Sequence, residues 1–264
     1  MMRFISLLSI AFILQCAPVI GMNDRGTIKH IHAPWGYPKG THSKDDYIIE
    51  RKQYVLSYNP KLNVANWVAW QLHASWYGDA PRKSGKFITD STLPSSFERI
   101  THDDYTKSGY DRGHMVRSEE RTANEDDNRA TFLMSNVLPQ TPTLNQQTWL
   151  SLEYECERLC KSEGKELYVI AGGVFSKQPP LLKGKVAVPD SCWKIVIILD
   201  KGQTPKDISR STTVIAVMMS NGTYDKSNNS WTRYTTTIDA IEQRIGYDVL
   251  SELPDALEDF LEKK

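Results

Sequence analysis

Three long apolar runs in the second half of the chain restrict its fold more than any other feature. They read "ELYVIAGGVF" at residues 166–175, "KVAVPDSCWKIVIIL" at 185–199 and "TTVIAVMMSN" at 212–221. A strand with one face in solvent alternates apolar and polar side chains, and these runs do not alternate. We therefore predict three strands of one sheet whose two faces are both covered.

A helix is expected directly before these strands, over residues 145–163. Its apolar side chains recur at helical spacing: Trp149, Leu152, Cys156 and Leu159. Gly164 follows as a C-terminal stop. Two shorter helices are predicted at the C-terminal end, over residues 238–246 and 254–264, with Pro254 in the first turn of the second.

The first half of the chain has weaker patterns. "YIIERKQYVLSYN", residues 47–59, predicts one or two strands, and Asn66–Trp76 is compatible with a buried strand or a short helix. Thr131–Gln140 is expected to be a buried strand that ends at Pro139. Because the helices do not alternate regularly with the strands, we predict a single α+β domain over residues 22–264, with a central, mainly antiparallel sheet and helices on both faces.

The N-terminal 21 residues have the pattern of a secretory signal peptide. Arg3 precedes the apolar run "FISLLSIAFIL", and Val19 and Gly21 are small enough to precede a cleavage site after Gly21. The apolar run is shorter than the roughly 20 residues of a membrane-spanning helix. We therefore expect an exported protein, secreted or periplasmic, without stable membrane association after cleavage.

The charge balance limits how the protein can bind nucleic acid. The full chain has 32 basic and 32 acidic residues, and removal of Arg3 with the signal peptide leaves 31 basic residues and a net charge of −1. A protein that holds nucleic acid by overall electrostatic attraction is strongly basic. Any phosphate-binding site in this chain is therefore expected to be local and built from a few arginines.

Cysteines and glycosylation sequons leave alternatives open. Cys156, Cys160 and Cys192 remain after cleavage, so Cys192 could pair with one of the other two, or all three could be buried thiols. "NGT" at Asn221 and "NNS" at Asn228 are acceptor sites only in a eukaryotic host.

The stretch "YDRGHMVRSEERT", residues 110–122, suggests a catalytic site. Neighbouring arginines favour a neutral imidazole at His114, which suits a general base next to a phosphate. Asn145 at the start of the long helix offers a neutral oxygen to a hard cation, and Glu153 lies two turns further along the same face. Each residue also has a structural alternative: an N-cap for Asn145, a solvated carboxylate for Glu153, an ion pair for Arg112 and a hydrogen-bonded role for His114.

The same stretch, together with "TFLMSNVLPQTPTLNQQTWLSLE" at residues 131–153, resembles the signature of the DNA/RNA non-specific endonucleases. These are ββα-metal (His-Me finger) nucleases of the endonuclease G and secreted sugar-non-specific types. Further similar segments, including "GKELYVIAGGVF" and "VAVPDSCWKIVI", extend the resemblance over nearly the whole chain after the leader. A serine hydrolase or a dinucleotide-binding enzyme is excluded, because the chain has neither a G-x-S-x-G elbow nor a complete glycine fingerprint.

The resemblance implies a metal-dependent endonuclease that cuts DNA and RNA without sequence preference and leaves 5′-phosphates. In this family's pattern His114 would be the general base, and Asn145 the one direct protein ligand of Mg²⁺, for which Mn²⁺ could substitute. Glu153 would hold metal-bound waters, and Arg112 and Asn136 would support the site and the phosphate. A homodimer is compatible with the family. The alternative is a nucleic-acid-binding protein of the same fold with impaired catalysis.

Two departures from the family pattern concern the phosphate-binding arginines. The family often has an arginine one helical turn after the glutamate, where this chain has Glu157; Arg158 is adjacent but points about 100° away on an ideal helix. The family arginine in the loop before the "F-x-x-D" segment is matched by Arg82, with one extra residue in the spacing, and Lys83 and Lys86 are alternatives. We predict Arg82 and Arg158 as the phosphate-binding residues.

Overall fold

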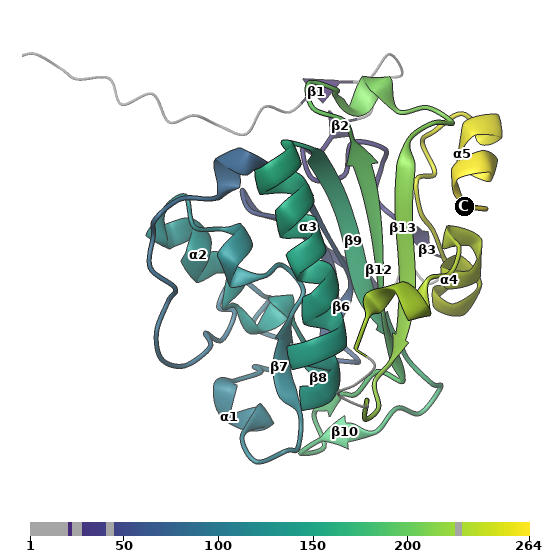
Figure 1. Ribbon diagram of the computed structural model, residues 1–264. Helices are drawn as coiled ribbons and strands as arrows, with labels where there is room; N and C mark the ends of the chain where they lie inside the picture. Colours follow the sequence, from purple (N-terminus) through teal and green to yellow (C-terminus); the bar gives the residue numbers. More distant parts are fainter. Residues whose placement is uncertain (1–20, 23–27, 41–44, 225–228) are drawn as a thin grey trace, which may run out of the picture.

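A six-stranded antiparallel sheet forms the centre of the protein (Figure 1). The computed structural model describes residues 21–22, 28–40, 45–224 and 229–264. From one edge to the other, the strands are β13 (Thr213–Ser220), β12 (Ser191–Leu199), β9 (Glu166–Val174), β6 (Val64–Leu72), β5 (Val55–Asn59) and β4 (Tyr47–Glu50). Every neighbouring pair is antiparallel, which confirms the predicted sheet.

Both faces of the sheet are buried, as the unbroken apolar runs predict. Along β12, Ile195 and Ile197 face one core and Val196 and Ile198 face the other. The core that contains Val196 and Ile198 lies under α3 (Leu150–Glu163), and the core that contains Ile195 and Ile197 lies under α4 (Ile238–Ile245) and α5 (Asp255–Leu261). Figure 1 shows α3 running across the sheet in front of β6 and β9, with α4 and α5 beside β13.

The long helix begins differently from the prediction. A π-helical segment, η5 (Leu144–Trp149), leads into α3, and the N-cap residue is Thr143. The N-cap alternative for Asn145 is therefore wrong. Gly164 ends α3 with φ +67°, the left-handed conformation that a glycine adopts without strain.

A short pair of strands packs beside α3. β7 (Asp111–His114) pairs antiparallel with β8 (Val137–Gln140), and η5 and α3 follow, so the predicted ββα unit is present. The prediction of one strand over Thr131–Gln140 is wrong for its first half, which contains the end of α2 (Glu125–Thr131) and the 3₁₀ turn η4 (Met134–Asn136). The apolar side chains of this half, Phe132 and Met134, are buried by turns rather than by an extended backbone.

The ambiguous segment Asn66–Trp76 is mostly strand. β6 extends to Leu72, and a 3₁₀ turn, η2 (Ala74–Trp76), follows it.

Pro254 is the N-cap residue of α5 and lies just before its first turn, not in it as predicted. The remaining elements are short: β1 (Gly21–Met22), β2 (Ile28–Lys29), β3 (Lys39–Gly40), α1 (His102–Tyr105), η3 (Ser118–Glu120), β10 (Leu181–Leu182), β11 (Val186–Ala187), η6 (Pro205–Asp207), η8 (Trp231–Tyr234) and β14 (Tyr247–Asp248).

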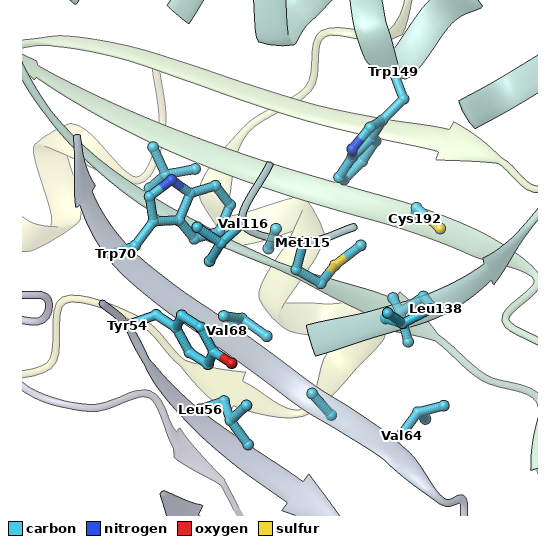
Figure 2. Packing of buried hydrophobic residues seen from close by; sticks show 14 of the residues in the cluster. Tyr54, Leu56, Val64, Val68, Trp70, Met115, Val116, Leu138, Trp149 and Cys192 are labelled. Carbon is cyan, nitrogen blue, oxygen red and sulfur yellow. The ribbon is translucent and has the colours of Figure 1, made fainter. Parts of the chain in front are cut away.

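The core between α3 and the sheet contains the residues that flank the catalytic stretch. Figure 2 shows Trp149 pointing from the helix toward the sheet near Cys192, with Met115 and Val116 on the same side. Met115 and Val116 directly follow His114, so their burial fixes the C-terminal end of β7 against the sheet.

The structure decides several of the remaining sequence alternatives. Cys156, Cys160 and Cys192 are buried free thiols, which is the second of the two alternatives left open by the sequence. At the sequon of Asn221, the side-chain nitrogen to which a glycan would be attached donates hydrogen bonds to the carbonyls of Pro139 and Pro189. This nitrogen is therefore already used within the fold. Asn228 and residues 1–20 lie outside the described part, and the signal peptide stays a prediction. No helix in the described ranges has the length and apolar character needed to span a membrane.

Candidate active site

The glycine of the Asp-Arg-Gly-His run is required by packing within the ββα unit. Gly113 pairs with Leu138 in the β7–β8 register, and the buried side chain of Gln140 lies directly over it. A Cβ atom on Gly113 would lie 2.1 Å from Gln140 Oε1. The close approach that glycine allows is therefore that of a neighbouring side chain, and it sets the position of β7 and of His114 at its end.

His114 lies in an aromatic setting with positive charge nearby. Its ring centroid is 4.9 Å from that of Phe87 and 5.0 Å from that of Phe132. Burial, together with the positive charge of Arg82, lowers the pKa of His114 to about 3. Its Nε2 atom is buried without a hydrogen-bond partner, which leaves Nδ1 as the accessible ring nitrogen. The imidazole is therefore neutral at physiological pH, as the sequence predicts.

Arg82 is held next to His114 by contacts to the 3₁₀ turn η3. Its guanidinium donates to Ser118 Oγ and to Glu119 Oε1, both at 2.8 Å, and its Cζ atom lies 5.2 Å from the ring centroid of Phe132. About half of its side chain is exposed, so it can still reach a ligand. Of the two alternatives, Lys86 instead pairs with Asp103, while the ammonium of Lys83 lies 5.4 Å from the Phe132 ring.

Asn145 is oriented by a carboxylate of β7. Its Nδ2 atom donates to Asp111 Oδ2 at 2.9 Å, and Gln146 donates to the same oxygen at 2.7 Å. The amide nitrogen is committed to Asp111, and within the described ranges no hydrogen bond is donated to the Asn145 carbonyl oxygen, which stays available. An amide oxygen beside a half-buried carboxylate is a donor set suited to a hard divalent cation.

Glu153 is buried on the inner face of α3. Burial raises its pKa to about 7 against the opposing effects of Lys194 and Arg117. Its Oε1 atom lies 3.9 Å from Lys194 Nζ and its Oε2 atom lies 3.6 Å from Arg117 Nε. The alternative of a solvated helix carboxylate is therefore wrong.

Arg117 is a site residue to which the sequence analysis gave no role. Its guanidinium contacts Glu119 at 3.2 Å, Glu153 at 3.6 Å and Glu157 at 2.8 Å. Only 12% of its side chain is exposed. Because Arg82 also binds Glu119, a continuous chain of charged side chains runs from Arg82, beside His114, to Glu153. The sequence contained an indication of this role. Glu157 stands where the resembled family often has an arginine, and a carboxylate at that position needs a nearby cation such as Arg117.

Lys194 is the second residue that was missed. It is 1% exposed, and its ammonium lies 4.1 Å from the Trp149 ring centroid and 5.7 Å from that of Trp70. A lysine within the otherwise apolar run "CWKIVIIL" requires a partner when it is buried, and that partner is Glu153. This single charge in a buried strand was the available sequence signal.

Three predicted residues have other contacts. Arg112 donates to the carbonyl oxygen of His102 and to Thr106 Oγ1, so it holds α1 rather than an open phosphate position. Asn136 is fully buried: its side-chain oxygen accepts from the amide of Val116, and its nitrogen donates to the carbonyls of Val116 and Thr131, which supports the segment that follows β7. Arg158 lies outside the group, because its exposed guanidinium binds Glu155 and Glu163 on its own helix.

Comparison with known proteins gives consistent matches. The family model described as DNA/RNA non-specific endonuclease matches residues 34–256. A nuclease of Nostoc sp. is 43% identical over 264 residues, covering 97% of this chain and 94% of the relative. Human mitochondrial endonuclease G is 34% identical over 160 residues, covering 56% of this chain and 53% of that protein.

The fold has a match among solved structures. A chain in the crystal structure of the EndoG/EndoGI complex, described as showing the mechanism of EndoG inhibition, superposes with a TM-score of 0.70. The match covers 84% of this chain and 91% of that chain at 23% sequence identity. At this level of identity the match concerns the fold.

Proposed function

Because the chain belongs to the DNA/RNA non-specific endonuclease family, we propose that it is a metal-dependent endonuclease that hydrolyses DNA and RNA without sequence preference. The observation that carries this proposal is the charged network that links Arg82, beside the neutral His114, to the buried Glu153. His114, Glu153 and the Asn145–Asp111 pair lie on the same ββα unit, and Arg82, Arg117 and Glu119 join it from the neighbouring segments.

His114 is the general base in this proposal. Its Nε2 atom is inaccessible, so the accessible Nδ1 takes a proton from water. The water oxygen then forms a bond to phosphorus while the bond to the 3′-oxygen breaks. The 3′-oxygen leaves and takes a proton from solvent, and the products carry a 5′-phosphate and a 3′-hydroxyl.

The chain's own residues also provide a cation site and a phosphate site. Asn145 would hold Mg²⁺, or Mn²⁺ in its place, with Asp111 and Glu153 binding the waters that complete its shell; when bound, the ion supplies positive charge to the scissile phosphate. Arg82 is the guanidinium placed to contact a phosphate oxygen, because half of its side chain is exposed beside His114. Export through the N-terminal signal and a homodimer remain parts of the proposal.

The test uses the chain from Met22 with supercoiled plasmid and with single-stranded RNA, in Mg²⁺ and in excess EDTA. Wild type is expected to cut both polymers only with metal, and to leave ends that DNA ligase can rejoin. His114→Ala should reduce kcat by about 10³, since general-base catalysis typically contributes between about 10² and 10⁴. Arg158→Ala, which removes an exposed arginine outside the site, is the matched control and should retain full activity.

The alternative, a binding protein with impaired catalysis, predicts a different result. In that case wild type would bind both polymers and cut neither in Mg²⁺, Mn²⁺ or Ca²⁺. Glu157 would then be the first position to change, because it replaces an arginine of the family pattern.

A further inference from the structure

Five carboxylates from α4, β14 and the end of α5 lie close together. Figure 1 shows α4 and α5 beside β13. Two overlapping groups share Glu262: one adds Asp239 and Glu242, and the other adds Asp248 and Glu258. Within each group, one oxygen from every residue lies within 4.8 Å of the others. These five residues are called the C-terminal carboxylate cluster below.

The central carboxylate of the cluster is buried, and one of its two oxygens has no hydrogen-bond partner. Glu262 is 7% exposed, and its Oε1 atom is inaccessible to solvent without a hydrogen-bond partner. Glu258 Oε1 is also inaccessible to solvent and has no hydrogen-bond partner. Carboxylates in this arrangement repel each other unless a proton or a cation lies between them.

The protein supplies no cation of its own to the cluster. None of the five carboxylates forms an ion pair with a lysine or arginine in the described part of the chain. Lys264, two residues from Glu262, instead donates to the carbonyl oxygens of Arg210 and Thr212. The missing positive charge therefore has to come from outside the chain.

Backbone contacts hold the carboxylates together. The amide of Asp239 donates to the carbonyl oxygen of Glu262 at 3.1 Å, which joins the start of α4 to the end of α5. The amide of Val249 donates to Glu242 Oε1 at 2.6 Å. The side chains are thus presented from three elements whose relative positions the backbone already defines.

We propose that the C-terminal carboxylate cluster is a binding site for Ca²⁺, centred on Glu262. The donors are all oxygens, which suits a hard cation and disfavours zinc. Ca²⁺ takes roughly six to eight oxygen ligands and readily accepts several carboxylates, whereas Mg²⁺ is usually bound by only one or two carboxylates and keeps its waters. Groups of three carboxylates that share Glu262 therefore favour Ca²⁺.

This site is separate from the proposed catalytic site. α4 and α5 cover the core that contains Ile195 and Ile197, whereas α3 and His114 lie on the other face of the sheet. The inference does not depend on nuclease activity. Its expected effect is structural, because the ion would fasten α5 to α4 and β14.

The test is the melting temperature of the metal-free chain at pH 8, measured in EDTA, in Ca²⁺ and in Mg²⁺ at matched ionic strength. Ca²⁺ at about 100 times its dissociation constant should raise the melting temperature by roughly 5 to 10 °C, and Mg²⁺ by less. Glu262→Gln should abolish the shift, and so should Glu258→Gln, which leaves the buried Glu262 in place. In EDTA, Glu262→Gln should be at least as stable as wild type, because it removes an unpaired buried charge.

Two controls separate this site from others. Asp259→Asn removes an exposed carboxylate of α5 outside the cluster, and Asn145→Ala removes the proposed ligand on the opposite face; both variants should keep the Ca²⁺ shift. The proposal is overturned if Ca²⁺ raises the melting temperature no more than matched NaCl does. It is equally overturned if Glu262→Gln and Glu258→Gln retain the shift, or if Asn145→Ala abolishes it.

Discussion

His114 and Glu153 show how burial sets two opposite acid–base states in one site. Burial disfavours the charged form of each group, so it lowers the pKa of the imidazole to about 3 and raises that of the carboxyl to about 7. The neutral imidazole needs no further adjustment to accept a proton. The carboxyl is poised near neutrality, where the charges of Lys194 and Arg117 favour its ionised form. Such divergent pairs are typical of sites that carry out proton transfer.

The raised pKa of Glu153 has a consequence for stability in the absence of metal. A carboxyl whose pKa is higher in the folded chain favours folding below its unfolded value of 4.5, and this contribution is lost as the pH rises toward about 7. In EDTA, the free energy of unfolding of wild type should therefore fall relative to Glu153→Gln between pH 4.5 and 7, by between about 1 and 3 kcal/mol. Urea unfolding at several pH values measures this difference. Parallel curves for the two proteins would contradict the raised pKa.

Gly113 should tolerate no side chain while Gln140 is present. Gly113→Ala places a Cβ atom 2.1 Å from a fully buried amide, and such overpacking typically costs about 1–3 kcal/mol. The displacement of β7 should also reduce cleavage, because His114 is the next residue. Gln140→Ala in the same chain should restore part of both losses. A double-mutant cycle measures the coupling, and strictly additive effects would mean that the two residues do not compete for the same space.

At the scale of elements, α3 presents glutamates to two different environments. Glu153 and Glu157 face the site, where Arg117 binds both. Glu155 and Glu163 face solvent, where Arg158 binds both. The rotation of 100° per residue along α3 turns Arg158 away from the site, as predicted. The guanidinium that lies next to Glu157 is that of Arg117, which directly precedes η3.

These two arginines should therefore respond very differently to substitution. Arg117→Ala leaves Glu119, Glu153 and Glu157 without their shared cation, and we expect a loss of about 2–4 kcal/mol in stability and at least a tenfold fall in kcat/KM. Arg158→Ala should change stability by less than about 0.5 kcal/mol and leave kcat/KM unchanged. Thermal melts and plasmid cleavage compare the two. If Arg158→Ala impairs cleavage as strongly as Arg117→Ala, the assignment of the two arginines is reversed.

At the scale of the whole molecule, the sheet separates the proposed catalytic side from the side covered by α4 and α5. The overall charge is neutral, so the protein as a whole does not attract a polyanion. Affinity for nucleic acid is then expected to come from a few contacts near His114.

This local binding predicts a modest dependence on salt that individual arginines control. Because each phosphate contact releases about one counterion, the slope of log KM against log salt should correspond to a small number of contacts. Arg82→Ala should reduce that slope by about one and weaken DNA and RNA to a similar extent. Steady-state cleavage of both polymers over a range of NaCl concentrations gives the slopes. An unchanged slope would show that Arg82 makes no phosphate contact.

The strand and helix patterns that proved predictable are those with a strong local cause. The apolar runs that became β9, β12 and β13 are buried on both faces, and helical spacing followed by Gly164 predicted α3. The pattern was less reliable over Thr131–Gln140, because a short apolar run is buried equally well by a turn or by a strand. The contacts of Arg112 and Asn136 were not predictable for a similar reason: residue type does not reveal which backbone carbonyl a donor will reach.

The sequence by itself determined the family, the sheet with two covered faces, and the ββα unit that carries His114, because these depend on local order and periodicity along the chain. Only the tertiary structure decided which charges meet. Arg117 contacts Glu153 and Glu157, which follow it by 36 and 40 positions in the sequence. Lys194 contacts Glu153 from β12, and four other carboxylates lie close to Glu262. Electrostatic interaction depends on distance in space and on burial, and neither is determined by spacing along the chain.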